Sequence, residues 1–135
     1  SHSEESAEQD SEIEALMGIF LDDFVELTPS TDGPRQFKLH LVPSLKEGEE
    51  VFISLDLIIR YTKTYPKTLP KFELTNIKGI DEDDFPELKK RIVDCIKPLK
   101  GNPMIFDFSM IIQDLLSELN LAPKSLFQQR EERQQ

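Results

Sequence analysis

The chain of 135 residues has little cysteine, histidine or positive charge, and each shortage excludes a class of function. One cysteine rules out an internal disulfide, and two histidines with it leave too few ligands for the usual zinc sites. Lys and Arg number 16 against 26 Asp and Glu, so the net charge is −10. Nucleic acids and anionic membranes are bound through surplus cations, so the sequence predicts neither as a partner. Apolar runs are too short to span a bilayer, and no signal-peptide pattern is visible.

The motifs that carry common enzyme chemistry are also missing. The chain has no P-loop, no G-x-G-x-x-G and no G-x-S-x-G. His40 alternates with the inward residues of a predicted strand, so we interpret it as a solvated or rim residue. Cys95 falls between Ile92 and Ile96 of a predicted helix, and we expect a buried or half-buried structural thiol. The sequence therefore predicts no enzyme activity, no metal and no cofactor.

The hydrophobic residues that are present, 38% of the chain, suffice for the core of one domain. Residues 1–10 carry no apolar pattern and are predicted to be a disordered acidic leader. Ser11 and Glu14 match a capping box, which predicts a helix over residues 12–21. The apolar residues that follow at helical spacing are Ile13, Leu16, Met17, Phe20 and Phe24.

Two further helices are predicted in the second half of the chain. The first starts after Asp81-Glu82-Asp83-Asp84, because acids suit a helix start, and it ends near residues 100–103. Its apolar stripe consists of Phe85, Leu88, Ile92, Ile96 and Leu99. The second runs over residues 104–119, with Asp107, Asp114 and Glu118 opposite its apolar stripe.

Strand periodicity fills the middle of the chain. Phe37, Leu39 and Leu41 alternate with polar residues, and a third short strand is predicted over residues 72–76. In the strand between them, one continuous apolar face consists of Val51, Ile53, Leu55, Leu57, Ile59 and Tyr61. The connection from Tyr65 to Pro70 holds two prolines four apart, which forbids both helix and central strand.

This order of elements predicts the α+β fold class, an antiparallel meander sheet packed on one face by helices. The helix comes first, then the strands with their proline-rich connection, then two helices, with room for one extra short strand.

Three phrases resemble the RWD domain family: residues 13–24, the Tyr65-Pro66-x-x-x-Pro70 connection, and Gly101-Asn102-Pro103 with the four residues after it. The resemblance covers residues 11–121 and leaves 122–135 as the start of a charged linker. It implies a fold similar to that of ubiquitin-conjugating enzymes. Those enzymes carry a cysteine and a His-Pro-Asn phrase after the equivalent connection, and residues 74–80 here have neither. The resemblance therefore implies a binding module without conjugating chemistry.

The phrase at residues 121–133 is similar to the exit of the RWD domains of amino-acid-starvation kinases. Kinases of this group phosphorylate the alpha subunit of translation initiation factor two. The resemblance implies docking of the kinase onto a basic segment of a large HEAT-repeat, ribosome-associated activator in the cytoplasm. The alternatives that stay open are the domain of a competing inhibitor, another adaptor, and a dimerisation or ubiquitin-pathway scaffold domain. We expect a monomer or a weak dimer.

Two groups of acids are candidate partner-binding residues. One is the Asp107, Asp114 and Glu118 stripe, and the other is Asp81, Glu82, Asp83 and Asp84. The hypothesis is that these acids meet a basic partner segment, since such contacts set association rate and specificity. The alternative is a solvated helix face for the stripe and helix capping for residues 81–84.

We interpret Tyr65, Pro66 and Pro70 as a structural motif. The Tyr65 ring is expected to lie against the prolines and its hydroxyl to find a backbone partner.

Overall fold

The protein forms one four-stranded antiparallel sheet with its strands in sequence order, β1-β2-β3-β4. The structure is a computed structural model that describes residues 4–27 and 35–120. The strands are β1 (Phe24–Glu26), β2 (Gln36–Leu41), β3 (Ser54–Arg60) and β4 (Lys71–Lys78). The helices are α1 (Glu4–Phe20), α2 (Phe85–Ile96) and α3 (Ile105–Leu119), with short 3-10 segments at Leu21–Asp23, Glu82–Asp84 and Lys97–Leu99.

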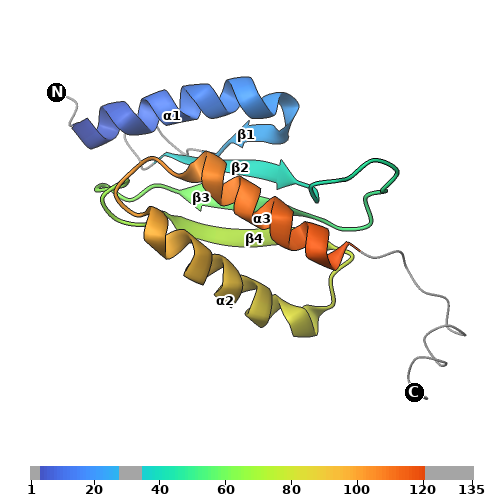
Figure 1. Cartoon of the computed structure of the whole chain (residues 1–135). Helices are drawn as coiled ribbons and strands as arrows, with labels where there is room; N and C mark the ends of the chain where they lie inside the picture. The colour runs from blue at the N-terminus through green and yellow to red at the C-terminus, as the bar shows by residue number, and fades with distance from the viewer. Residues whose placement is uncertain (1–3, 28–34, 121–135) are drawn as a thin grey trace, which may run out of the picture.

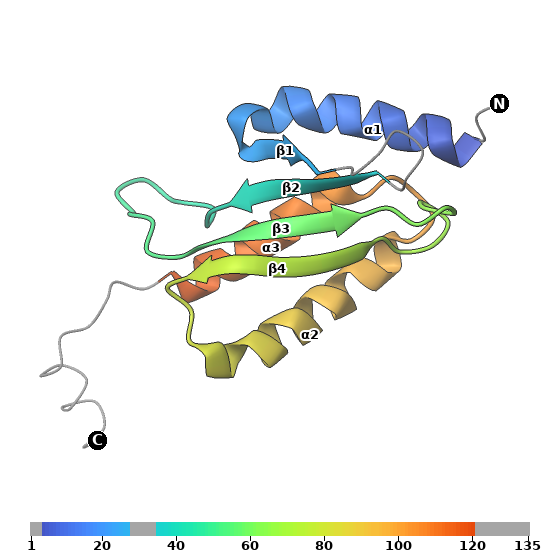
Figure 2. The ribbon, with the colours of Figure 1, turned by 180° about the vertical axis from the view of Figure 1, so that it is seen from behind.

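Helices and strands form two layers (Figure 1). From behind, the strands lie in front, and α2 and α3 lie on their far side (Figure 2). One face of the sheet is therefore packed against helices, and we call the other the open face. This arrangement confirms the predicted α+β class and the meander with one wet face.

Alternation along the strands sorts side chains between the two faces, as the period of a strand requires. Phe37, Leu39 and Leu41 of β2 are buried, and so are Leu55, Leu57 and Ile59 of β3. Phe72 of β4 meets Phe108 of α3 edge to face, with ring centroids 5.1 Å apart. The core thus lies between the sheet and the helices.

The first helix begins at Glu4, so the prediction of a disordered leader was wrong for residues 4–10. Gln9 continues the stripe of Ile13 and Leu16 one turn earlier and is buried with them. Its amide donates to the carbonyls of Thr62 and Tyr65, at 3.0 and 2.9 Å. Gln9 can be buried because distant carbonyls accept its hydrogen bonds. A search for periodic apolar residues does not find such a position. Residues 1–3 lie outside the described part of the chain.

The expected capping box is not formed, because Ser11 and Glu14 both lie inside α1. Phe24, which continues the helical spacing beyond the predicted end of the helix at residue 21, starts β1 and stacks on Phe37 with centroids 5.1 Å apart. β1 is the extra short strand, and it pairs antiparallel with β2. Val51 is 45% exposed and lies before β3, which begins only at Ser54.

The two C-terminal helices, α2 and α3, each begin within one residue of the predicted start. The predicted linker at 122–135 lies outside the described residues, and the domain boundaries at 11 and 121 stay a prediction. Within 4–27 and 35–120, no helix is long and apolar enough to cross a membrane.

Candidate interaction site on α3

The start of α3 is held by a carboxylate from α1. Glu12 accepts a hydrogen bond from the backbone N–H of Ile105 at 2.9 Å, where a helix has unsatisfied donors. The other Glu12 oxygen accepts from the hydroxyls of Tyr61 and Tyr65, at 2.6 and 2.8 Å. The Tyr65 hydroxyl in turn accepts from the N–H of Met104 at 2.7 Å. Side chains from α1 and from the segment after β3 thus fix where α3 begins.

The Tyr65 ring is fully buried and stacks on Tyr61, with centroids 4.5 Å apart. Burial, reinforced by the Glu12 carboxylate, raises the pKa of both tyrosines above its usual value. The hydroxyl finds a backbone partner, as the sequence led us to expect. Sequence reasoning placed Tyr61 on the buried strand face, as found, but missed its hydrogen bond to Glu12. It missed Glu12 altogether, because Glu12 does not belong to the Tyr65-Pro66-x-x-x-Pro70 phrase.

Both prolines of that phrase are buried. The Tyr65–Pro66 peptide bond is cis. The Pro66 carbonyl accepts from the N–H of Gly101 at 2.8 Å, which ties the connection to the turn before α3. Tyr65, Pro66 and Pro70 therefore lie inside the scaffold that positions α3, not on its outer surface.

The end of α3 is also hydrogen-bonded to other segments of the chain. The side chain of Asn120 accepts from the N–H of Phe52 at 2.8 Å and donates to the carbonyl of Glu50 at 2.7 Å. The N–H of Ser44 donates to the carbonyl of Gln113 at 3.2 Å. With both ends fixed, the outer face of α3 is a rigid surface.

That outer face carries one row of exposed residues, each four positions after the last: Phe106, Met110, Asp114 and Glu118. Side chains four apart are neighbours on a helix, so these residues form a continuous ridge, which we call the α3 ridge. Asp107 is exposed beside its first turn. The apolar side chains occupy the first half of the ridge and the acids the second half.

The charge of α3 is one-sided. Its 15 residues include three acids and no Lys or Arg. Asp114 and Glu118 lie in the C-terminal half, where the helix dipole is negative and disfavours acids. The structure therefore concentrates negative potential at the end of the ridge at some cost in stability.

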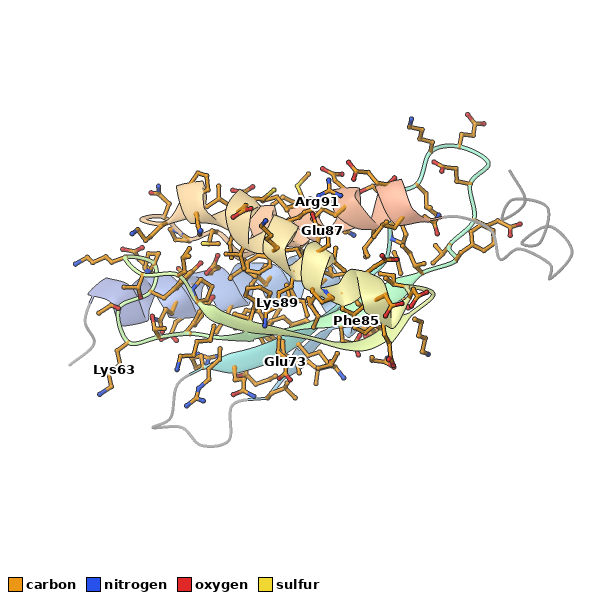
Figure 3. The ribbon with its side chains drawn as sticks, turned by 90° about the horizontal axis from the view of Figure 1, so that it is seen from below. Lys63, Glu73, Phe85, Glu87, Lys89 and Arg91 are labelled. Carbon is orange, nitrogen blue, oxygen red and sulfur yellow. The ribbon has the colours of Figure 1, made fainter. Side chains whose placement is uncertain are left out.

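Intramolecular partners of these acids are few and exposed. Glu118 forms an ion pair with Arg91 of α2 at 2.9 Å, and both side chains are largely exposed. Figure 3 shows Arg91 in the helix layer, on the side away from the sheet. Asp114 accepts a long hydrogen bond of 3.4 Å from the Ser44 hydroxyl. Exposed pairs of this kind contribute about 0–1 kcal/mol, so a partner's cations can replace them.

The second acidic group, Asp81 to Asp84, is exposed just before α2. The Asp81 carboxylate accepts from the N–H of Asp83 at 3.2 Å and so caps the 3-10 segment Glu82–Asp84. Asp84, at the start of α2, makes no side-chain capping bond, so the acids do not cap α2 as expected. The start of α2 and the end of α3 lie at the same end of the molecule (Figures 1 and 2). The structure thus brings these acids to the end that carries Glu118, whereas Asp107 lies at the opposite end of α3.

His40 and Cys95, the two residues considered for a catalytic role, both lie at the surface of the fold. His40 lies on the open face, as expected, and its Nδ1 is 2.8 Å from Asp56, whose other oxygen accepts from Asn76 at 3.3 Å. Cys95 is exposed, so the prediction of a buried or half-buried thiol was wrong. It precedes Ile96 by one residue, which turns it about 100° away from the buried stripe of α2. Within the described ranges, no group of three His, Cys, Asp or Glu could hold a metal ion.

A family model described as "RWD domain" matches residues 7–116 of the chain. The chain is 36% identical over 134 residues to the rat protein "eIF-2-alpha kinase GCN2", and 37% identical over 116 residues to the human protein of that name. These matches cover 96% and 83% of this chain but only 8% and 7% of the relatives. The chain therefore spans less than a tenth of their length.

A solved structure agrees with the arrangement described above. The solution structure of the RWD domain of mouse GCN2 superposes with a TM-score of 0.79 at 32% sequence identity. The likeness covers 93% of this chain and 97% of that one, so it extends over the sheet and the helices.

Proposed function

We propose a docking role from the premise that this chain belongs to the RWD domain family, a family of non-catalytic protein-interaction modules. In this proposal the chain docks a starvation-response kinase, which phosphorylates the alpha subunit of initiation factor two, onto a large HEAT-repeat activator. The activator is associated with ribosomes, which places the complex in the cytoplasm. The names of the relatives support the kinase assignment, because they are eIF-2-alpha kinases of which this chain matches a small part. The catalytic work belongs to the rest of such a kinase.

The single observation that carries the site assignment is the one-sided charge of α3. Three acids and no cation lie on a helix whose two ends are held by the core. A basic segment of the activator meets Asp107, Asp114 and Glu118 there, and Arg91 shares Glu118 with it. Because these acids are exposed, they act mainly on association rate and specificity.

The acids at 81–84 are a second part of the same proposal. They extend the negative surface past the end of α3 and add long-range attraction rather than direct contacts. Their effect is therefore expected to fade first as salt is added, since the Debye length falls to about 8 Å at physiological ionic strength.

Charge reversal on the α3 ridge tests the proposal. The chain is immobilised and incubated with the purified HEAT-repeat activator, and the retained activator is quantified. Asp114→Lys with Glu118→Lys is expected to abolish capture, because both acids at the end of the ridge become cations. The melting temperature stays nearly unchanged, since both residues are exposed.

A matched control separates a local effect from a change in net charge. Asp22→Lys with Asp23→Lys alters the net charge equally, at exposed positions in the 3-10 segment after α1. This control is expected to capture the activator normally. Because Glu118→Lys places a cation beside Arg91, a variant with Asp107→Lys and Asp114→Lys repeats the test without that contact. Normal capture by both ridge variants would overturn the proposal.

A further inference from the structure

The α3 ridge has an apolar half that the docking proposal leaves unused. Phe106 and Met110 are 44% and 46% exposed, and they lie one turn apart on the outer face of α3. Single exposed apolar residues are common on protein surfaces and call for no explanation. Here two large apolar residues follow each other along the ridge, and two acids continue it at the same spacing. The ridge is therefore apolar toward the start of α3 and acidic toward its end.

The core does not require these two side chains. The buried face of α3 is already occupied by Ile105, Phe108, Ile112, Leu115 and Leu116. The outer face of a helix is ordinarily polar, and the acids further along the ridge follow that pattern. Phenylalanine and methionine are enriched in protein interfaces, and methionine adapts to differently shaped partners.

We propose that the α3 ridge binds one amphipathic helix of the partner, which carries apolar side chains along one half of its contact face and lysines or arginines along the other half. Phe106 and Met110 are the apolar anchors, and Asp114 and Glu118 receive the cations. From Phe106 to Glu118 the ridge rises about 18 Å, which suits three to four turns of a facing helix. This inference rests on the proposed function, and it adds the order of apolar and basic residues that the partner must have.

Charge complementarity supports this occupant over a second copy of the chain. A second α3 ridge would bring acids against acids in one of the two relative orientations, and neither orientation offers it a cation from α3. A basic partner helix finds negative potential from Asp114, Glu118 and the negative end of the helix dipole in the same place. Sedimentation of the free chain tests the alternative. A dimer that dissociates when Phe106 and Met110 are replaced by serine would overturn the assignment, because the ridge would then bind a second copy.

Synthetic peptides provide the probe, because the partner helix itself is not identified. One peptide carries leucines along one half of a helical face and lysines along the other half. A second peptide has the same composition, with leucines and lysines shuffled along that face. Fluorescence anisotropy measures both dissociation constants with the unaltered chain, so this comparison does not depend on any variant folding. The ordered peptide is expected to bind about tenfold tighter, and equal affinities would overturn the inference.

Variants locate the contact. Phe106→Ser with Met110→Ser is expected to weaken binding of the ordered peptide about tenfold or more, the usual size of an effect at anchor residues. The control is Val25→Thr with Val51→Thr, because these residues are 40% and 45% exposed but lie on β1 and before β3. The control is expected to bind normally, and each variant's fold is checked by circular dichroism on heating.

The dependence on salt distinguishes failure of this inference from failure of the docking proposal. Loss of Phe106 and Met110 should weaken binding at all salt concentrations, whereas the neutral acid variant, Asp114→Asn with Glu118→Gln, should weaken binding at low salt and reduce its salt dependence. If the acid variant loses binding and the apolar variant does not, only the anchor assignment is wrong. If the acid variant binds the peptide and the activator normally, the docking proposal itself is wrong.

Discussion

At the scale of single residues, Glu12 joins α1 to the two buried tyrosines and to the start of α3. Its carboxylate accepts from two tyrosine hydroxyls and from the first N–H of α3. Every buried side-chain nitrogen and oxygen in the described ranges has a hydrogen-bond partner. Removal of this one acceptor would leave three donors without their shared partner.

We predict that Glu12→Ala lowers the free energy of unfolding by about 3 kcal/mol, because the buried donors of Tyr61 and Tyr65 would lose their acceptor. The stability of Glu12→Gln should lie between that of Glu12→Ala and that of the unaltered chain, because the carbonyl oxygen of glutamine keeps one acceptor. Glu14→Ala is the control, as Glu14 is exposed on the same helix. Urea unfolding measures all three, and equal midpoints for Glu12→Ala and Glu14→Ala would contradict the prediction.

At the scale of elements, β3 and β4 pair with two cations directly opposite each other. Arg60 and Lys71 are register partners on the open face, and both are exposed. Like charges in directly opposed positions destabilise a sheet by a fraction of a kcal/mol. This pair therefore weakens the end of the sheet that leads into the connection with Tyr65.

We predict that Lys71→Glu raises the free energy of unfolding by about 0.5 kcal/mol, because repulsion across the strands becomes attraction. The gain should shrink as salt is added, since both side chains are exposed. Lys63→Glu changes the net charge equally but lies outside the strands, and it should leave stability nearly unchanged. Thermal unfolding at low and high salt checks the sign, and a lower melting temperature for Lys71→Glu would contradict it.

At the scale of the whole molecule, the tyrosine–glutamate cluster links α1, the connection and α3. Tyr61 and Tyr65 must stay protonated to donate to Glu12, and burial raises the pKa of both. A group whose pKa is higher in the folded state stabilises the fold fully below its unfolded pKa, which is about 10 for tyrosine. That contribution is lost as the pH rises through and beyond this value.

We therefore predict that the tyrosines leave the free energy of unfolding nearly independent of pH below about pH 9. Above about pH 10 their titration in the unfolded chain lowers it steeply. Each tyrosine contributes a slope of about 1.4 kcal/mol per pH unit there, because the unfolded chain binds one proton fewer. Tyr61→Phe should be less stable at neutral pH but show a shallower alkaline slope. Urea unfolding at several pH values gives the slopes, and equal slopes for both proteins would contradict the assignment.

The sequence alone determined the elements whose side chains follow a simple period. The stripes of α2 and α3 and the alternation in β2 are visible in the chain because burial on one face repeats every 3.6 or 2 residues. The acids of α3 were also visible, because an amphipathic helix displays its outer face in the same pattern. A shortage of cations and of catalytic motifs was enough to direct attention to protein partners.

Only the tertiary structure decided what depends on residues far apart in the chain. Gln9 is buried because carbonyls more than 50 positions away accept its hydrogen bonds. Glu12 reaches an N–H that lies 93 positions later, and the three-residue β1 exists because β2 pairs with it. Local patterns carry no record of such contacts, since a hydrogen bond across the fold leaves the composition and period of its neighbourhood unchanged.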